Sequence, residues 1–415
     1  MKKIIFCLMI FVFCLFLTVS CAEKQKGGVS DPSDLTEENE NSKEISEDAS
    51  AEETSSAEGS SDEETSSEEN NKYTVIKDLG IPSEKRFPDI KNTARNVWDM
   101  IVFDNYLYIG QGDYDKNLGP CDVWRMNIKT SEWENSGSVY DEQINRFRVI
   151  NGKLTIPGTD PKDPWDCGSH YVLENGEWKK YRSIKGGIHV FDMCMYDGKL
   201  FASIGALPEN SAMAVSDDLG KTFSPVKFFK NSEPLDLTAG ITNRAYDLFV
   251  INGELYTLFY SSADQNEIYK YSGESFEYYC SWDHKFINTY LYYVPLGEKV
   301  SFKDSLFIAS GHFYKAEKDP KNIEYVALPN VNRVWDVLVY DDTLYVLCDR
   351  IKKSGYDTVV LKSDDGENFS EILSFEKSLP SRSFAFDGKT FWFGLGTLDE
   401  STFDSGRIIS AGCSE

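Results

Sequence analysis

The pattern of hydrophobic and polar positions repeats along residues 73–415. Each copy is an apolar run, a turn of Asp/Asn-Gly type, and then Leu with aromatic and β-branched residues. This Leu recurs at intervals of 38 to 55 residues, at Leu107, Leu154, Leu200, Leu255, Leu306 and Leu344, with Thr390 in its place in the seventh copy. A period of about 40–50 residues is typical of four-stranded propeller blades. We therefore predict an all-β chain, a β-propeller of seven four-stranded blades.

Tight turns separate the two inner strands that the pattern predicts for each unit. Four of these turns carry a favourable dipeptide, namely Asn151-Gly152, Asp197-Gly198, Asn252-Gly253 and Asp387-Gly388. Asn-Gly and Asp-Gly favour two-residue hairpins because both central residues adopt positive φ. Helical periodicity over ten or more residues is nearly absent, which argues against a doubly wound α/β fold.

The second half of each unit is a short strand, a polar turn and another strand opened by an apolar residue. This residue is Trp133, Trp178, Phe223, Phe276, Ile323 or Phe369. The last unit lacks such a fourth strand, whereas residues 72–77 look like a fourth strand without a blade. We therefore expect the N-terminal strand to pair in the last blade and remove the exposed sheet edges. The alternatives are a β-sandwich, two smaller β domains, or six or eight blades.

The first 72 residues differ from the repeat. Lys2 and Lys3 precede an apolar run over residues 4–19, as in an export signal, and the segment closes at Cys21. Residues 22–72 hold 17 Asp or Glu against 4 Lys and almost no large apolar residue. Such a segment buries too little apolar surface to fold, and we expect a disordered acidic tether. The domains are thus a signal at 1–21, a tether at 22–72 and a propeller at 73–415.

Net charge narrows the range of partners. The whole chain carries −25, and the predicted propeller keeps a clear excess of acidic residues without any Lys/Arg-rich run. Nucleic-acid binding rests on neutralising phosphates with basic side chains. We therefore expect no nucleic-acid partner.

Two resemblances follow from these motifs. Ser20-Cys21 after the apolar run resembles the lipobox of bacterial lipoproteins, which implies acylation at Cys21, membrane attachment and a place on the extracytoplasmic side of the cell envelope; ordinary signal cleavage or an uncleaved anchor are the alternatives. The turn SDDLGKTF at residues 216–223 and the segment GIHVFDMCMYDGKLFASIG resemble bacterial exported BNR/kelch-like (Asp-box) β-propellers. That resemblance implies an architecture and leaves the activity open, because propellers host unrelated functions.

One mouth of the propeller is the predicted binding surface. The residues before each inner strand, and the loops between second and third strands, should line the same end of the ring. At the strand starts this surface would carry Asn96, Arg146, His189, Arg244, Arg333 and Arg382. Guanidinium groups bind carboxylates in a bidentate way, so the set could hold an anion or a polar glycan. The structural alternative is that arginines pair locally, Arg244 with Asp247 and Arg333 with Asp336.

The loops at the same mouth add further candidates. Tyr114 and Trp165 are stacking groups in loops rich in Gly, Asp, Asn and Pro. Two pairs of aspartates, Asp113 with Asp115 and Asp160 with Asp163, offer oxygen ligands for calcium, but no EF-type spacing exists and ordinary loop chemistry explains them better. We expect no cofactor and no metal site.

Cysteines and catalytic motifs complete the picture. Cys121 and Cys167 end corresponding loops of neighbouring units, where they form either a disulfide or two buried thiols. No HExxH, GxSxG or GxxxxGK[ST] occurs. The chain is thus expected to be a surface-tethered binding or scaffold propeller for a glycan or an envelope protein. The alternative is a sialidase-like or lyase-type carbohydrate-active enzyme using the same mouth.

Overall fold

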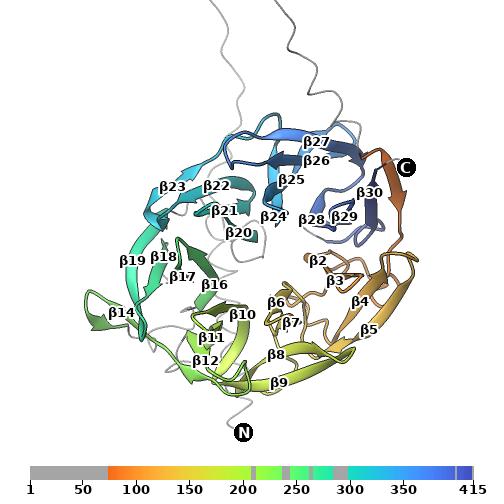
Figure 1. The fold of residues 1–415 in the computed structure, drawn as a ribbon. Coiled ribbons are helices and arrows are strands. Elements are labelled where there is room, and N and C mark those ends of the chain that lie inside the picture. Colours follow the sequence, from red (N-terminus) through yellow and green to blue (C-terminus); the bar gives the residue numbers. More distant parts are fainter. Residues whose placement is uncertain are drawn as a thin grey trace, which may run out of the picture. The chain divides into compact units, whose positions relative to one another are not determined.

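The computed structural model describes residues 73–206, 212–235, 244–260, 265–283, 298–397 and 400–413, all within one compact unit. These residues form a ring of antiparallel sheets around a central axis, which is a β-propeller (Figure 1). The prediction of an all-β propeller is confirmed. The predicted signal, Cys21 and the acidic tether lie outside the described residues.

Five sheets are separate four-stranded blades. Their strands are β2 (Asp99–Phe103), β3 (Tyr106–Gly110), β4 (Cys121–Asn127) and β5 (Trp133–Val139); β6 (Arg148–Ile150), β7 (Lys153–Pro157), β8 (Cys167–Glu174) and β9 (Glu177–Lys185); β20 (Glu298–Phe302), β21 (Ser305–Ser310), β22 (His312–Glu317) and β23 (Ile323–Tyr325); β24 (Arg333–Tyr340), β25 (Thr343–Lys352), β26 (Gly355–Ser363) and β27 (Ser370–Lys377); and β28 (Ser381–Phe386), β29 (Thr390–Leu395), β30 (Ile408–Gly412) and β1 (Val75–Asp78). A short 3-10 helix, η3 (Pro320–Asn322), precedes β23.

The rest of the ring is one ten-stranded sheet. It contains β10 (Gly187–Tyr196), β11 (Lys199–Ala206), β12 (Met213–Ser216), β13 (Ser224–Pro225), β14 (Lys227–Lys230), β15 (Glu233–Pro234), β16 (Arg244–Ile251), β17 (Glu254–Tyr260), β18 (Gln265–Tyr271) and β19 (Ser275–Asp283).

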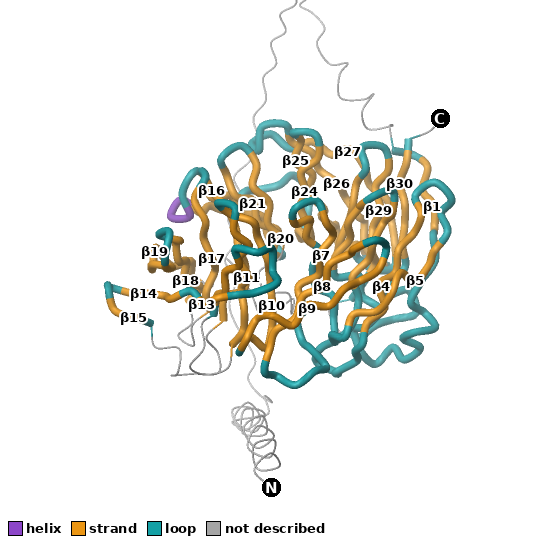
Figure 2. The backbone as a smooth tube through the Cα atoms, turned by 60° about the horizontal axis from the view of Figure 1, so that its bottom comes forward, coloured by secondary structure: helices purple, strands orange, loops and turns teal. Residues whose placement is uncertain are grey.

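The predicted number of seven four-stranded blades is therefore wrong, because only five blades are separate. Two local pairings merge the expected third and fourth units. Gly205 of β11 pairs with Arg244 of β16. The chain then leaves β13 after two residues, and β14 pairs in parallel with β19. The β14–β15 hairpin consequently projects from the rim of the ring (Figures 1 and 2).

Three of the four predicted Asn/Asp-Gly turns have positive φ at both residues. At Asp387-Gly388 only Gly388 does, with φ of 93°, and Phe386 pairs with Phe391 across a four-residue turn, so the prediction is wrong there. Asn151 and Gly152 have φ of 48° and 74°, and Asp197 and Gly198 have 47° and 72°. Two consecutive positive φ values define the type I′ turn, whose twist matches that of the flanking strands.

The N-terminal strand closes the ring. β1 pairs antiparallel with β30, and Val75 lies opposite Gly412. Tyr73 is buried and packs edge-on against Phe386 and Phe391, with ring centroids 6.2 and 5.0 Å apart. The predicted closure by the N-terminal strand is confirmed.

The core lies between the faces of neighbouring sheets. One cluster joins β24–β27 to the closing blade, for example through Leu347 and Phe393, and another joins β2–β5 to β6–β9 through Tyr108 and Ile156. Aspartates add polar contacts between neighbours. Asp99 Oδ2 accepts the backbone N–H of Phe147 at 2.5 Å, in the next blade. Two other aspartates also accept a backbone N–H from the unit that follows their own. Asp192 accepts from Leu248 N at 3.2 Å, and Asp336 accepts from Phe384 N at 3.0 Å.

The ring has two ends (Figure 2). We call the end at which the inner strands begin the mouth. The opposite end, where the hairpins β2–β3 and β4–β5 and their counterparts turn, is the turn face.

Candidate functional site

Buried charges converge where the inner strands begin. Arg146 Nη1 is 2.7 Å from Asp247 Oδ1 and 3.1 Å from Asp192 Oδ2, and its Nε is 3.4 Å from Glu298 Oε1. Arg148 Nε is 2.8 Å from Asp192 Oδ1. These residues come from β6, β10, β16 and β20 or the segments just before them. Together with Lys299, whose Nζ is 2.9 Å from Asp247 Oδ2, they form what we call the central network.

The central network balances three acids against three bases, but Asp99 and Asp336 beside it add two more carboxyl groups, and the pKa values of these two neighbours reflect the added acid. Burial, and then the negative charge of Glu298, raise the pKa of Asp99 to about 7. The same two causes raise the pKa of Asp336 well above its ordinary value. Burial also opposes the ionisation of Asp192, but the nearby positive charges of Arg148 and Arg146 hold its pKa below the usual range.

Cations and aromatic rings alternate at the mouth. The guanidinium carbon of Arg382 lies 4.5 Å from the ring centroid of Trp98 and 5.3 Å from that of Trp335. Arg333 stacks on the same Trp335 at 5.1 Å and on Tyr356 at 5.2 Å. We call these five side chains the cation–aromatic stack. Distances of this size are those of attractive cation–π contacts.

Hydrogen bonds hold this stack in place. Arg333 Nη2 is 3.1 Å from Asp349 Oδ2, which also accepts from Trp335 Nε1 at 2.8 Å. Arg382 donates to the carbonyl of Thr397. Both guanidinium groups are thus fixed in orientation before any ligand arrives.

A second group lies at the same mouth beside the ten-stranded sheet. The ring of His189 stacks on Phe191 at 5.5 Å, Phe191 contacts Tyr246 at 4.6 Å, and the guanidinium carbon of Arg244 is 5.9 Å from the Phe191 centroid. His189 Nδ1 is 2.6 Å from the carbonyl oxygen of Thr159.

His189 is neutral in this setting. Burial, and then the charge of Arg244, lower the pKa of His189 to about 4. The neutral ring therefore donates through Nδ1–H to Thr159 and keeps Nε2 as an acceptor. Asp160 Oδ1 is 3.8 Å from His189 Nδ1, and burial, followed by the charges of Glu142 and Asp141, raises the pKa of Asp160 to about 7.

β-Bulges aim these side chains at the mouth. The register shifts at Phe191, Tyr246, Trp335 and Arg382, each in the inner strand of its unit. A bulge inserts one extra residue and re-aims a side chain, which is why these four positions depart from strict alternation.

The structure separates the predicted mouth residues into two sets. His189, Arg244, Arg333 and Arg382 lie at the mouth as described above, although Arg382 is itself buried, with 8% of its surface exposed. Asn96 is fully buried, where it accepts from Thr397 N at 3.0 Å and donates to Thr397 O at 2.9 Å. Arg146 is also buried, within the central network.

The local arginine pairs suggested by the sequence are replaced by longer-range ones. Arg333 pairs with Asp349 of the next strand, and Asp247 pairs with Arg146 and Lys299 from other sheets. In the sequence, an aromatic residue directly precedes the aspartates of the inner strands, as in Trp98-Asp99, Phe191-Asp192, Tyr246-Asp247 and Trp335-Asp336, and this repeated dipeptide was a signal for them. Glu298 and Lys299 had no such signal, because they follow an irregular part of the sequence.

The predicted loop residues are placed as follows. Trp165 is 49% exposed, and Tyr114 is half-buried with its backbone N–H 3.2 Å from Gln143 Oε1. Asp113 accepts from the backbone and side chain of Thr93, at 2.7 and 2.9 Å. Across the described ranges, no group of three or more His, Cys, Asp or Glu side chains could hold a metal ion.

Cys121 and Cys167 are both free thiols in the structure; Cys121 is buried and Cys167 is half-buried. Cys121 Sγ is 3.1 Å from the carbonyl oxygen of Glu142.

No helix in the described part of the chain has the length and apolar character needed to span a lipid bilayer.

Comparisons with known proteins show the fold. No family model matches the sequence, and no curated protein sequence matches it. The chain is similar in structure to a streptogramin B lyase, with a TM-score of 0.50 and 10% identity over 84% of this chain and 100% of that one. A chain of the mitotic checkpoint complex has a TM-score of 0.50 and 7% identity, covering 88% and 99%. Virginiamycin B lyase from Staphylococcus aureus has a TM-score of 0.49 and 10% identity, covering 82% and 99%. At these identities the likeness indicates a propeller and no particular activity.

Proposed function

We propose that this chain is a surface-tethered binding or scaffold propeller that holds a glycan or an envelope protein at its mouth. The observation that carries the proposal is the cation–aromatic stack. Tryptophan, tyrosine and arginine are the residue types most enriched at energetically important contacts. Here they meet at one end of the ring and are already ordered.

Preorganisation is the physical advantage of this arrangement. Asp349 and the carbonyl of Thr397 fix the guanidinium groups of Arg333 and Arg382. A ligand that meets them loses less side-chain entropy than one that must order a free arginine. Guanidinium groups donate hydrogen bonds, and the carboxylates and hydroxyls of a glycan, or of an acidic protein segment, are suitable acceptors for them.

Attachment to the membrane is the second part of the proposal. We expect acylation at Cys21 and an acidic tether over residues 22–72 that carries the propeller on the extracytoplasmic side of the envelope.

Similarity to Asp-box (BNR/kelch-like) propellers is supported by the turn after β12, where Asp218 Oδ1 accepts from Thr222 N and Ser216 Oγ accepts from Gly220 N, both at 2.8 Å.

The anchor has a direct test. Cells expressing Cys21→Ser should lose incorporation of a palmitate analogue and release the protein from the membrane fraction, because the acylated thiol is absent. Cys7→Ser, within the apolar run, is the control and should leave both readouts unchanged. Continued labelling of Cys21→Ser would overturn the acylation.

A lyase-type or other carbohydrate-active enzyme is the alternative, and one observation favours it. Asp160, with its pKa near 7, lies close to the neutral ring of His189, and Arg244 is near both. A carboxyl group whose proton moves near neutral pH, beside a neutral imidazole, is suited to general acid–base catalysis.

One experiment tests binding and catalysis together. The full chain in detergent is applied to an array of neutral, carboxylated and sulfated glycans and to envelope extract, alongside Arg333→Ala and Arg244→Ala. We expect affinity to fall about tenfold or more in these variants, which corresponds to about 1.4 kcal/mol.

Lys227→Ala, which removes an exposed cation from β14 at the rim, should bind like the parent. Binding without turnover supports the scaffold function. Turnover of a bound glycan that Asp160→Asn abolishes would establish the enzyme instead. A parent that binds nothing, or mouth variants that bind as well as the parent, would refute the proposed function.

A further inference from the structure

The turn face has hollows that are separate from the residues of the mouth. Three of them open there, each between the inner and outer hairpin turns of a unit. Their volumes are about 490, 360 and 480 Å³, beside the turns of β2–β5, β6–β9 and β16–β19 respectively. Small-molecule sites occupy clefts of about 300–1,000 Å³.

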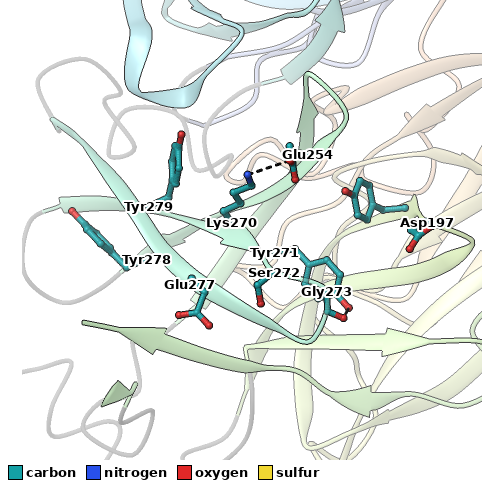
Figure 3. Close-up of a pocket in the computed structure, with 10 residues that line it drawn as sticks. Asp197, Glu254, Lys270, Tyr271, Ser272, Gly273, Glu277, Tyr278 and Tyr279 are labelled. Atoms are coloured by element: carbon teal, nitrogen blue, oxygen red, sulfur yellow. Dashed lines mark hydrogen bonds and ion pairs between the residues drawn. The ribbon is translucent and has the colours of Figure 1, made fainter. Parts of the chain in front are cut away.

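Tyrosines form the walls of the hollow beside β16–β19 (Figure 3). Tyr271 OH donates to Gly273 O at 2.6 Å, Tyr196 OH donates to Gly253 O at 3.0 Å, and Tyr279 OH donates to Asp319 Oδ2 at 2.5 Å. Each hydroxyl is thus held by the protein. The rings are therefore fixed in place, and Lys321 Nζ already lies 4.1 Å from the ring centroid of Tyr279. A ligand in the hollow would meet the rings of Tyr196 and Tyr271 first.

Carboxylates stand between these rings. Glu254 pairs with Lys270 at 3.2 Å, and Figure 3 shows this contact within the hollow. Glu277 accepts from Ser275 Oγ at 2.7 Å, and Asp197 is exposed at the β10–β11 turn. Among the described side chains, no cation lies within ion-pair distance of Glu277 or Asp197. The hollow therefore has more negative charge than its one lysine balances.

A second hollow repeats this composition in the β2–β5 blade. Tyr106 and Trp133 flank Glu132 and Glu134 at the corresponding place between two hairpin turns. Trp133 is fixed because its Nε1 donates to Leu79 O at 3.1 Å. The hollow of the β6–β9 blade differs, since Lys153 and Lys221 line it. Glu134 pairs with Arg125 Nε at 2.7 Å, and the guanidinium carbon of Arg125 lies 4.3 Å from the ring centroid of Tyr106. Among the described side chains, Glu132 is the acid of this hollow without a cation at ion-pair distance. Two of the three hollows thus share aromatic residues and at least one carboxylate that no described cation neutralises.

We propose that these two hollows bind a saccharide with free amino groups, such as a chain of deacetylated hexosamine units. The aromatic rings would stack on sugar faces, and the carboxylates would accept hydrogen bonds from hydroxyl and ammonium groups. Uronates, sulfated glycans and phosphates are repelled by the same charges. Two sites on one face also allow a polymer to bind both at once, with a higher overall affinity than either site alone.

The site is independent of the mouth, and the test keeps the two apart. The full chain in detergent is titrated calorimetrically with a tetramer of β-1,4-linked glucosamine, with the N-acetylated tetramer and with an oligogalacturonate. We expect binding of the glucosamine tetramer at two sites per chain and at least tenfold weaker binding of the other two.

Conservative variants locate the sites. The double variant Glu277→Gln and Asp197→Asn should reduce the number of sites from two to one, and Glu132→Gln should weaken the remaining one. Glu324→Gln, an exposed glutamate of β23, and Arg333→Ala at the mouth should leave the titration unchanged. Equal binding of the acidic or N-acetylated oligomer, no binding by the parent, or unchanged binding in the acid variants would overturn the proposal.

Discussion

At the scale of single residues, the aspartates of the inner strands do two jobs. Asp99, Asp192 and Asp336 each accept a backbone N–H from the next unit, and so join neighbouring sheets. Burial strengthens these hydrogen bonds, but it also disfavours the charged form of each aspartate unless an arginine lies near. Asp192 has Arg146 and Arg148 within ion-pair distance, whereas Asp99 faces Glu298 as well, so their pKa values move in opposite directions.

This difference predicts opposite pH dependences of stability. The pKa of Asp99 is about 7 in the folded state, against an ordinary 3.8. The contribution of Asp99 to the free energy of unfolding is therefore complete below pH 3.8 and is lost as the pH rises through 7. The loss amounts to as much as about 4 kcal/mol. Asp99→Asn should therefore lose less stability than the parent between pH 5 and 8, as measured by urea unfolding.

Asp192→Asn is the matched control with the opposite sign. Its folded-state pKa is lowered, so the contribution of Asp192 is present above its ordinary pKa and is lost as pH falls. The variant should differ most from the parent at neutral pH and least in acid. A parent-like pH slope for Asp99→Asn would show that Asp99 ionises normally.

At the scale of elements, the strands and turns followed from the sequence better than their side-chain partners did. Asn151-Gly152 and Asp197-Gly198 could be recognised because positive φ at two adjacent residues is a local requirement. The merging of two units could not, since it depends on where Gly205 and β14 find partners. The mouth positions of Trp335 and Arg382 likewise depend on β-bulges, which leave no reliable trace in the pattern.

Closure by β1 gives a prediction at this scale. Tyr73 is buried against Phe386 and Phe391, so Tyr73→Ala should lower the free energy of unfolding by about 3–5 kcal/mol through lost burial and a cavity. Val75→Ala in the same strand is the control, because Val75 is exposed; it should change stability by about 0.5 kcal/mol or less. Urea unfolding of both variants measures the difference. Equal effects would mean that β1 does not hold the last blade through Tyr73.

At the scale of the whole molecule, the ring presents two chemically different ends. Arginine and histidine stack on aromatic rings at the mouth, whereas glutamate lies among tyrosine and tryptophan at the turn face. Sequence reasoning could place His189, Arg244, Arg333 and Arg382 at the mouth because each of them stands near the start of an inner strand. It missed the central network and the hollows, because both are assembled from residues that only the closed ring brings together, such as Arg146 with Glu298 and Tyr196 with Glu277.

Both ends exist only if the ring is closed by β1, and hydrogen exchange of the backbone amides measures this closure most directly. Those amides of residues 75–78 that bond to β30 should exchange as slowly as the amides of residues 408–412, because β1 and β30 open together in a closed blade. Rapid exchange over residues 75–78 beside a protected β30 would contradict the closed ring and the two faces that depend on it.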